Sequence, residues 1–354
     1  MKTFKLLVWV SLCFFLNSVY AQQRHTAQIT VHVKDDADNP VPGIEVGAST
    51  FWRHIPGPEF GSDEDKTVTQ TTDANGFATL SITCFSDWEN ISMEVAYGAA
   101  RGTKAKPGYY EPTGLSSTIR FTNVISGKWQ PWNPILELRV DRILNPIPMF
   151  AKKVWQAQIP SQGRPVGYDL VVGDWVAPDG KGKIPDLLLA FVKKTNGVVL
   201  TDPGKIERQL HDNSLTVSFF NVGDGIQSVA ATSGGLRLPR EAPTNGYRPE
   251  LVKRDFEIAT NVVVFERETK VVRHSDFDRN ANYFFRVRTK MDDKGNITNA
   301  LYGKIYGDLG ENFGTGKIGF TYYLNPKPNS RNMEFNTKSN LFKNLKPLEQ
   351  VSAP

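Results

Sequence analysis

The sequence predicts an all-β protein built from two β-sandwich domains, and three observations lead to this prediction. Aliphatic residues alternate with polar ones over short stretches, which is the period of a half-buried strand. Glycine and proline are frequent, with 29 and 22 of the 354 residues, as expected for a chain with many turns. No window repeats its apolar residues with the 3.6-residue period of a helix. The length favours two domains over one.

Residues 1–21 have the pattern of a secretory signal peptide. Two lysines give a positive start, residues 6–16 form an apolar core, and residues 19–21 fit a small-residue cleavage site. The core is shorter than the roughly 20 residues that span a bilayer. We therefore expect cleavage after Ala21 and a secreted, periplasmic or extracellular protein with no membrane span after cleavage. The alternatives are a retained anchor helix and lipidation at Cys13, although the apolar run continues past that cysteine.

Residues 22–144 are predicted to form the first sandwich. Two stretches have the pattern strand, tight turn, strand: V-H-V-K-D-D-A-D-N-P-V-P-G-I-E-V at residues 31–46 and T-D-A-N-G-F-A-T-L at residues 72–80. Asp, Asn, Pro and Gly supply the turns. We expect a two-residue turn with positive φ at Asn75-Gly76, and we expect Cys84 to continue a buried row of alternate residues.

Residues 28–84 resemble the carboxypeptidase regulatory-like and bacterial Ig-like modules. The shared pattern is V-x-V-x-D, then P-V-P-G-I-x-V, then T-D-x-N-G-x-A. The resemblance implies an Ig-like or transthyretin-like sandwich that serves as a non-catalytic accessory in secreted proteins. No H-x-x-E or H-E-x-x-H zinc signature accompanies the pattern, so no peptidase activity is expected.

A larger β-sandwich of unknown type is predicted over residues 151–325. Residues 145–150 precede it as a linker stiffened by two prolines, unless they bend an edge strand within one continuous domain. Residues 326–354, rich in Asn, Pro and Lys, are predicted to be an irregular tail. A short helix is expected at residues 206–211. Strands are predicted over residues 168–176, 186–194, 215–221, 256–267, 282–291, 301–306 and 317–324, with a hairpin loop at residues 292–296.

The charge pattern excludes some classes of partner. The net charge is only +5, and basic residues are interspersed with acidic ones. We therefore expect no nucleic acid partner and no electrostatic attachment to a membrane. We also expect no cofactor.

His274, Asp276 and Asp278 are the candidate metal ligands. They occur in H-S-D-F-D, where alternate residues of a strand project to one side. They would either ligate a metal or pair a base with an orienting carboxylate. The alternative is a polar turn that opens the next strand.

Four residues near the start of the second domain are candidates for binding. Asp174 and Asp186 would suit glycoside hydrolysis, which uses two carboxylates about 5–10 Å apart, unless they are turn residues. Trp155 and Trp175 would form an aromatic platform for a sugar or peptide, unless they fill the core.

No catalytic residue is predicted. The sequence favours a secreted non-catalytic binding or structural protein of the cell exterior, whose partner is a polysaccharide or an extracellular protein. The alternative is a secreted carbohydrate-active enzyme with its active site in the second domain.

Overall fold

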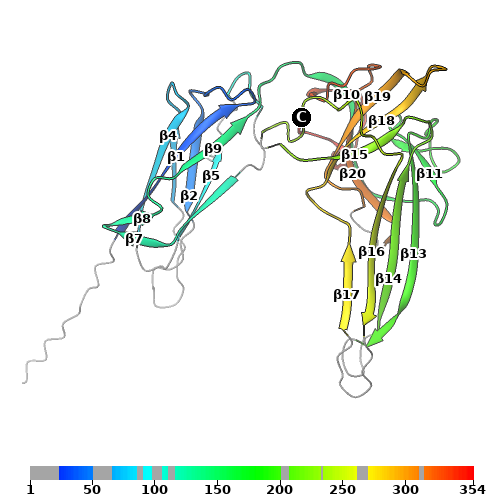
Figure 1. Ribbon diagram of the computed structural model, residues 1–354, viewed down its shortest axis with the longest axis horizontal. Helices are drawn as coiled ribbons and strands as arrows, with labels where there is room; N and C mark the ends of the chain where they lie inside the picture. Colours follow the sequence, from blue (N-terminus) through cyan, green and yellow to red (C-terminus); the bar gives the residue numbers. More distant parts are fainter. Residues whose placement is uncertain are drawn as a thin grey trace, which may run out of the picture. The chain divides into compact units, whose positions relative to one another are not determined.

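The computed structural model describes residues 24–50, 66–85, 91–97, 106–110, 116–200, 207–232, 234–260, 270–310 and 315–354. In these ranges strands dominate, and the helical element η2 (Pro347–Glu349) is a single short turn (Figure 1). The prediction of an all-β protein is confirmed. The predicted signal peptide lies outside the described residues.

The chain divides into two compact units. The first comprises residues 1–33, 40–103 and 116–137, and the second comprises residues 34–39, 104–115 and 138–354. Residues 34–39, 104–115 and 138–144, which were predicted in the first domain, belong to the second unit. The turn at residues 34–39 illustrates this. Its Asp36 pairs there with Arg142 and Arg240 at 2.7 and 2.8 Å.

The first unit contains two sheets. One has the order β4-β1-β8-β7, with β9 also paired to β1, and the other has the order β3-β2-β5-β6. The strands are β1 (Arg24–Asp35), β2 (Glu45–Thr50), β3 (Lys66–Thr71), β4 (Phe77–Phe85), β5 (Ile91–Tyr97), β6 (Ser116–Phe121), β7 (Asn123–Ile125), β8 (Lys128–Gln130) and β9 (Ile135–Val140). Ile29, Val31 and Val33 are fully buried, as their alternation predicts.

The turn between β3 and β4 is longer than predicted. The N–H of Gly76 donates to the carbonyl of Asp73 at 3.0 Å, so the turn spans four residues. The Asp73 carboxylate accepts the N–H groups of Asn75 and Phe77 at 2.9 Å each. Gly76 has a φ of 76°, as predicted, whereas Asn75 is not among the residues with positive φ. The side chain of Cys84 lies outside the described part of the chain.

The second unit contains two six-stranded sheets. Their orders are β15-β18-β19-β20-β10-β21 and β12-β11-β13-β14-β16-β17. The strands are β10 (Ile147–Gln158), β11 (Val166–Asp169), β12 (Asp174–Trp175), β13 (Leu187–Leu200), β14 (Glu207–Ser218), β15 (Gly225–Val229), β16 (Glu250–Thr260), β17 (Lys270–Ser275), β18 (Asn282–Met291), β19 (Ile297–Tyr306), β20 (Lys317–Leu324) and β21 (Phe335–Asn340). A shared core of residues such as Leu189, Phe285 and Tyr322 joins the sheets.

Three segments of the second unit differ from the sequence prediction. β10 begins at Ile147, inside the predicted linker, because it pairs with β20 on one side and β21 on the other. β21 lies in the predicted irregular tail, where Met333 and Phe335 are fully buried. The helix predicted at residues 206–211 is replaced by β14, which has strand neighbours on both sides. Pairing with neighbouring strands of the sheet overrides local propensity at these places.

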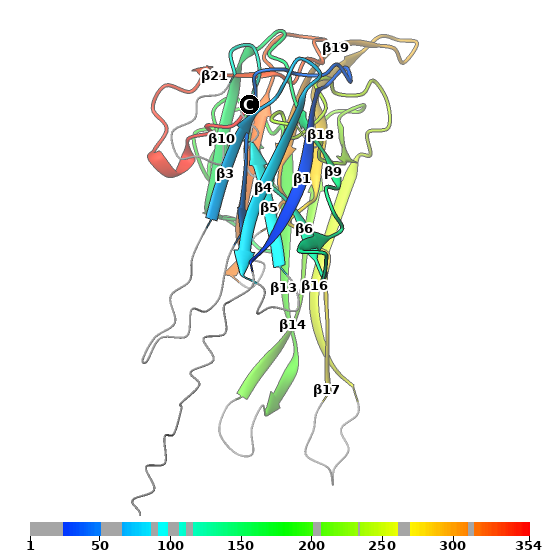
Figure 2. The same cartoon turned by 90° about the vertical axis from the view of Figure 1, so that its left-hand side faces the viewer.

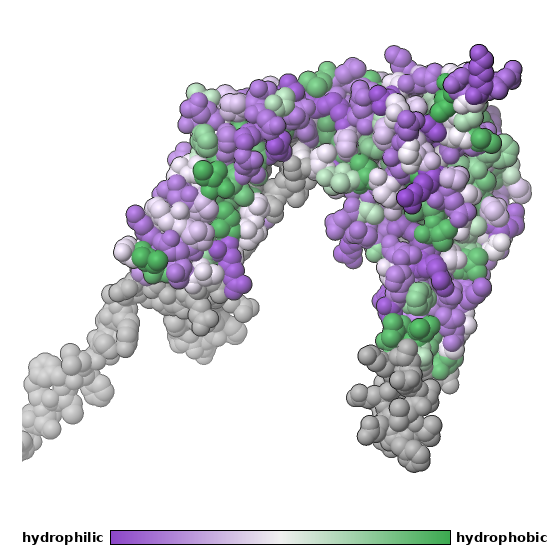
Figure 3. Space-filling model, viewed as in Figure 1, coloured by the Kyte–Doolittle hydropathy of each residue, from purple (hydrophilic) through white to green (hydrophobic). Residues whose placement is uncertain are grey.

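Four strands, β13, β14, β16 and β17, continue past the ends of the second unit's other strands (Figures 1 and 2). On the face shown in Figure 3, hydrophilic and hydrophobic residues are mixed over the described part of the chain. Exposed apolar residues on these long strands include Val198, Ile258 and Val272. In the described ranges we find no helix with the length and apolar character that crossing a membrane requires.

Candidate functional site

The predicted acid Asp186 is part of a buried ion-pair cluster. Arg288 on β18 donates from Nε to Asp186 Oδ1 at 2.7 Å and from Nη2 to Asp186 Oδ2 at 2.9 Å. The same Nη2 reaches Asp169 Oδ1 at 3.1 Å. Burial raises the pKa of Asp186, and Arg288 opposes that rise. The cluster ties the segment between β11 and β13 to the other sheet of this unit.

Asp169 holds the same segment through backbone donors. Burial alone would raise the pKa of Asp169, but backbone N–H groups, from Lys183 and Ile184 first, outweigh burial and lower it. Those two N–H groups lie 2.9 and 3.0 Å from Oδ2. A carboxylate whose oxygens are all occupied by backbone N–H donors stabilises a loop and is not available for proton transfer.

Asp174 and Trp175 also have structural roles in the described chain. Asp174 accepts the N–H of Trp175 at 2.9 Å and that of Lys181 at 3.0 Å, which closes a turn. Trp175 is only 8% exposed and meets Tyr168 edge to face, with ring centroids 5.3 Å apart. The structure therefore does not bring Asp174, Trp175 and Asp186 together at an open cleft.

The candidate metal ligands are brought together only in part. His274 Nε2 lies 2.8 Å from Asp276 Oδ1. Asp276 also accepts the N–H of Arg254, whereas Asp278 accepts the N–H of Asn280. β17 ends at Ser275, so strand alternation does not continue through Asp278. Among the described residues, no group of three His, Cys, Asp or Glu side chains could hold a metal ion.

Trp155 is the predicted binding residue that reaches the surface. It lies on β10 with 43% of its area exposed, and Lys153 Nζ sits 4.5 Å from its ring centroid. The register of β10 against β20 shifts between Val154 and Ala157, which marks a β-bulge. Gln156 in this bulge has a φ of 47°, in the left-handed region that non-glycine residues seldom adopt. Bulges often re-aim a side chain beside a functional site.

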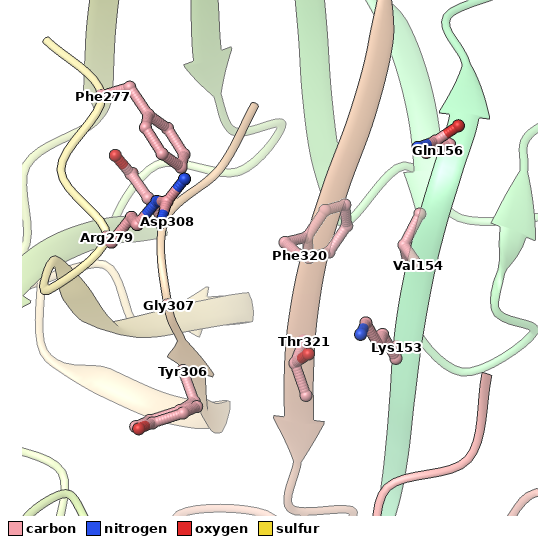
Figure 4. A pocket seen from close by; sticks show the side chains of 10 residues that line it. All are labelled: Lys153, Val154, Gln156, Phe277, Arg279, Tyr306, Gly307, Asp308, Phe320 and Thr321. Carbon is pink, nitrogen blue, oxygen red and sulfur yellow. The ribbon is translucent and has the colours of Figure 1, made fainter. Parts of the chain in front are cut away.

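The bulge borders a pocket of about 520 Å³ in the second unit. Residues of β10, β20, the end of β19 and the segment after β17 line the pocket (Figure 4). Val154, Phe277 and Phe320 give it apolar walls. Lys153 and Gln156 approach from β10, whereas Arg279 lies on the side of Phe277 and Asp308. Polar and charged side chains therefore line the pocket together with these apolar walls.

Asp308, the pocket's carboxylate, is fully occupied by donors. Its side chain is buried and accepts a hydrogen bond from Lys253 Nζ. It also accepts the hydroxyl of Tyr283 at 2.9 Å and the N–H groups of Asp278 and Leu309 at 2.8 Å each. The Asp308–Lys253 ion pair therefore stabilises one wall of the pocket, and the carboxylate that lines the pocket is already paired.

Sequence reasoning proposed Trp155 but did not propose Lys153, Gln156 or Arg279, which line the pocket. Only the position of Gln156 beside Trp155 gave a local hint. Arg279 reaches the pocket from a segment more than one hundred residues further along the chain, so no spacing motif could link it to β10.

No family model matches the chain, and no curated protein matches it. Among solved structures, it is similar to a streptococcal ancillary pilin, with 12% identity and a TM-score of 0.20 over 52% of this chain and 58% of that one. It is also similar to BcpA, the major pilin subunit of Bacillus cereus, with 11% identity and a TM-score of 0.19 over 84% and 95% of the two chains. The third is the major pilin SpaD from Corynebacterium diphtheriae, with 13% identity and a TM-score of 0.22 over 88% and 84%. The resemblance to carboxypeptidase regulatory-like modules stays a prediction.

Proposed function

We propose that the protein is a secreted, non-catalytic binding protein of the cell exterior, and that the pocket beside Trp155 receives a polysaccharide. The observation that carries the proposal is the exposed Trp155 in a strained bulge, where its chain neighbours Val154 and Gln156 both line a pocket. A position in a paired strand would allow the indole to be buried, yet 43% of its area faces solvent. The signal-peptide pattern of residues 1–21 supports the exterior location.

The chemistry of the rim suits a sugar. One face of a pyranose ring presents C–H groups that pack on an indole, and its edge presents hydroxyl groups. The Gln156 amide offers both donors and an acceptor for those hydroxyls. Because the bulge holds Gln156 in an unfavourable backbone conformation, the surrounding strands must compensate a cost of order 1–3 kcal/mol. We infer that this strain is kept because it aims the amide into the pocket.

The alternative of a carbohydrate-active enzyme is less well supported. A glycosidase uses two carboxylates, one of them able to transfer a proton to the leaving group. Asp186 is paired with Arg288, Asp174 closes a turn, and Asp308 is saturated. Each of these acids therefore already has a structural role.

Binding to a panel of polysaccharides, measured by affinity electrophoresis, tests the proposal. Trp155→Ala should weaken the retained interaction by tenfold or more, as expected for an aromatic anchor. Trp132→Ala is the matched control, because Lys128 Nζ also lies 4.5 Å from its ring centroid but the pair is in the first unit. Absence of binding to every polymer, or equal losses in both variants, would contradict the proposal. Turnover of a polymer that disappears in Asp174→Asn would favour the enzyme.

A further inference from the structure

We infer that the pocket selects an anionic polysaccharide, one whose sugars carry carboxylate or sulfate groups, and this inference rests on the proposed function. Lys153 and Arg279 approach the pocket from opposite sides of Phe320 (Figure 4). In the described part of the chain, neither cation has a carboxylate within ion-pair distance. Two cations that line one pocket without acidic partners favour an anion there.

The remaining charges near the pocket do not cancel this positive character. Asp308 forms an ion pair with Lys253 and accepts three further hydrogen bonds. Its negative charge is therefore compensated within the pocket wall. Tyr306, Thr321 and Gln156 add neutral polar groups to the lining. The pocket thus has one cationic side chain on each side of Phe320 and one compensated carboxylate.

The positions of these cations match a charged sugar better than a small free anion. Lys153 both lines the pocket and contacts the ring of Trp155. The ammonium covers part of the indole, so a sugar packed on the exposed part of the ring would lie next to this cation. The planar guanidinium of Arg279 can hold a carboxylate or sulfate through two parallel hydrogen bonds. Stacking and charge recognition are then supplied by adjacent parts of one site.

Pairs of polymers that differ only in charge distinguish the contribution of the charge to binding from that of the sugar. The probes are polygalacturonate, its fully methyl-esterified form, a sulfated galactan and the same galactan without sulfate. The purified protein should bind at least one charged polymer about tenfold more tightly than its neutral partner, and added salt should reduce the difference. Whichever charged polymer shows the larger preference identifies the anion.

Substitutions in the pocket test which side chains bind the anionic group of the polymer. Lys153→Met and Arg279→Gln should each lower the affinity for the charged polymer severalfold, toward that of the neutral polymer. Lys294→Met removes the same charge from the exposed hairpin loop at the opposite end of β19 and should change neither affinity. Circular dichroism and the thermal midpoint confirm that each variant is folded.

Three outcomes would overturn the inference, and they can be told apart. Equal binding of charged and neutral polymers, lost in Trp155→Ala, refutes the anionic preference and leaves the proposed function standing. Absence of binding to all four polymers refutes the proposed function itself. Binding of polyglutamate as tight as that of polygalacturonate, and unaffected by Trp155→Ala, would assign the pocket to an acidic protein partner instead.

Discussion

The two units bury different kinds of side chain. In the described part of the first unit, the buried polar residues are Thr50 and Thr72, and the rest of the core is apolar. Every buried charged residue of the described chain lies in the second unit, including Lys253, Lys304 and Glu334. An apolar core built by strand alternation requires no specific ion-pair or hydrogen-bond partners. A core with buried charges is stable only if each charge has such a partner. The second unit should therefore be the more sensitive to single substitutions.

Breaking the cluster of Arg288, Asp169 and Asp186 should have the largest effect. Arg288→Met leaves the buried Asp186 carboxylate without its cation, which should lower the free energy of unfolding of the second unit by about 3–5 kcal/mol. Urea unfolding measures the change. The control is Arg139→Met, because its pair with Asp38 is exposed and should contribute less than about 1 kcal/mol. Similar losses in both variants would show that burial does not distinguish the two pairs.

Lys304 should make the stability of the second unit depend on pH. Burial lowers the pKa of Lys304 to about 7, with Glu334 partly opposing this shift. Between pH 7 and about 10 the unfolded chain binds a proton at this lysine that the folded protein does not bind. The free energy of unfolding should therefore rise with pH in this window, by up to about 1.4 kcal/mol per pH unit.

Urea titrations at several pH values test this prediction. Lys304→Met should be more stable than the wild type at pH 6.5 and should lose most of the slope, whereas Lys294→Met should keep it. An identical slope in the wild type and Lys304→Met would refute the prediction.

In the first unit, the backbone is the sensitive element. Gly76→Val should destabilise this unit by about 1–3 kcal/mol, because Gly76 has a φ of 76° and a Cβ there would lie 2.6 Å from the Val33 carbonyl oxygen. Gly127 has the same φ, but nothing lies within 4 Å of its Cβ position. Gly127→Val should thus show only the conformational part of the cost. An unchanged thermal midpoint for Gly76→Val would contradict the assigned turn.

The sequence predicted those parts of the fold that depend on local pattern. Strands at residues 282–291 and 317–324 were predicted with the observed bounds, and the loop at residues 292–296 closes through Asp292, as its composition indicates. β21 was missed because its Asn- and Lys-rich surroundings conceal the buried Phe335. Most of the candidate site could not be predicted, because its cations come from separate segments and a bulge interrupts the alternation at Gln156.

The pairing of β10 with β21 has a consequence for the order of folding. Asn340 donates to the carbonyl of Ala151 across 189 residues of chain, and β10 needs this neighbour to complete its sheet. The strands β1 to β9, by contrast, have all been made once residue 140 is reached. During synthesis, the first unit can therefore fold while β10 still exposes an unpaired edge. A chaperone, or a second incompletely folded chain, would bind the protein at this edge.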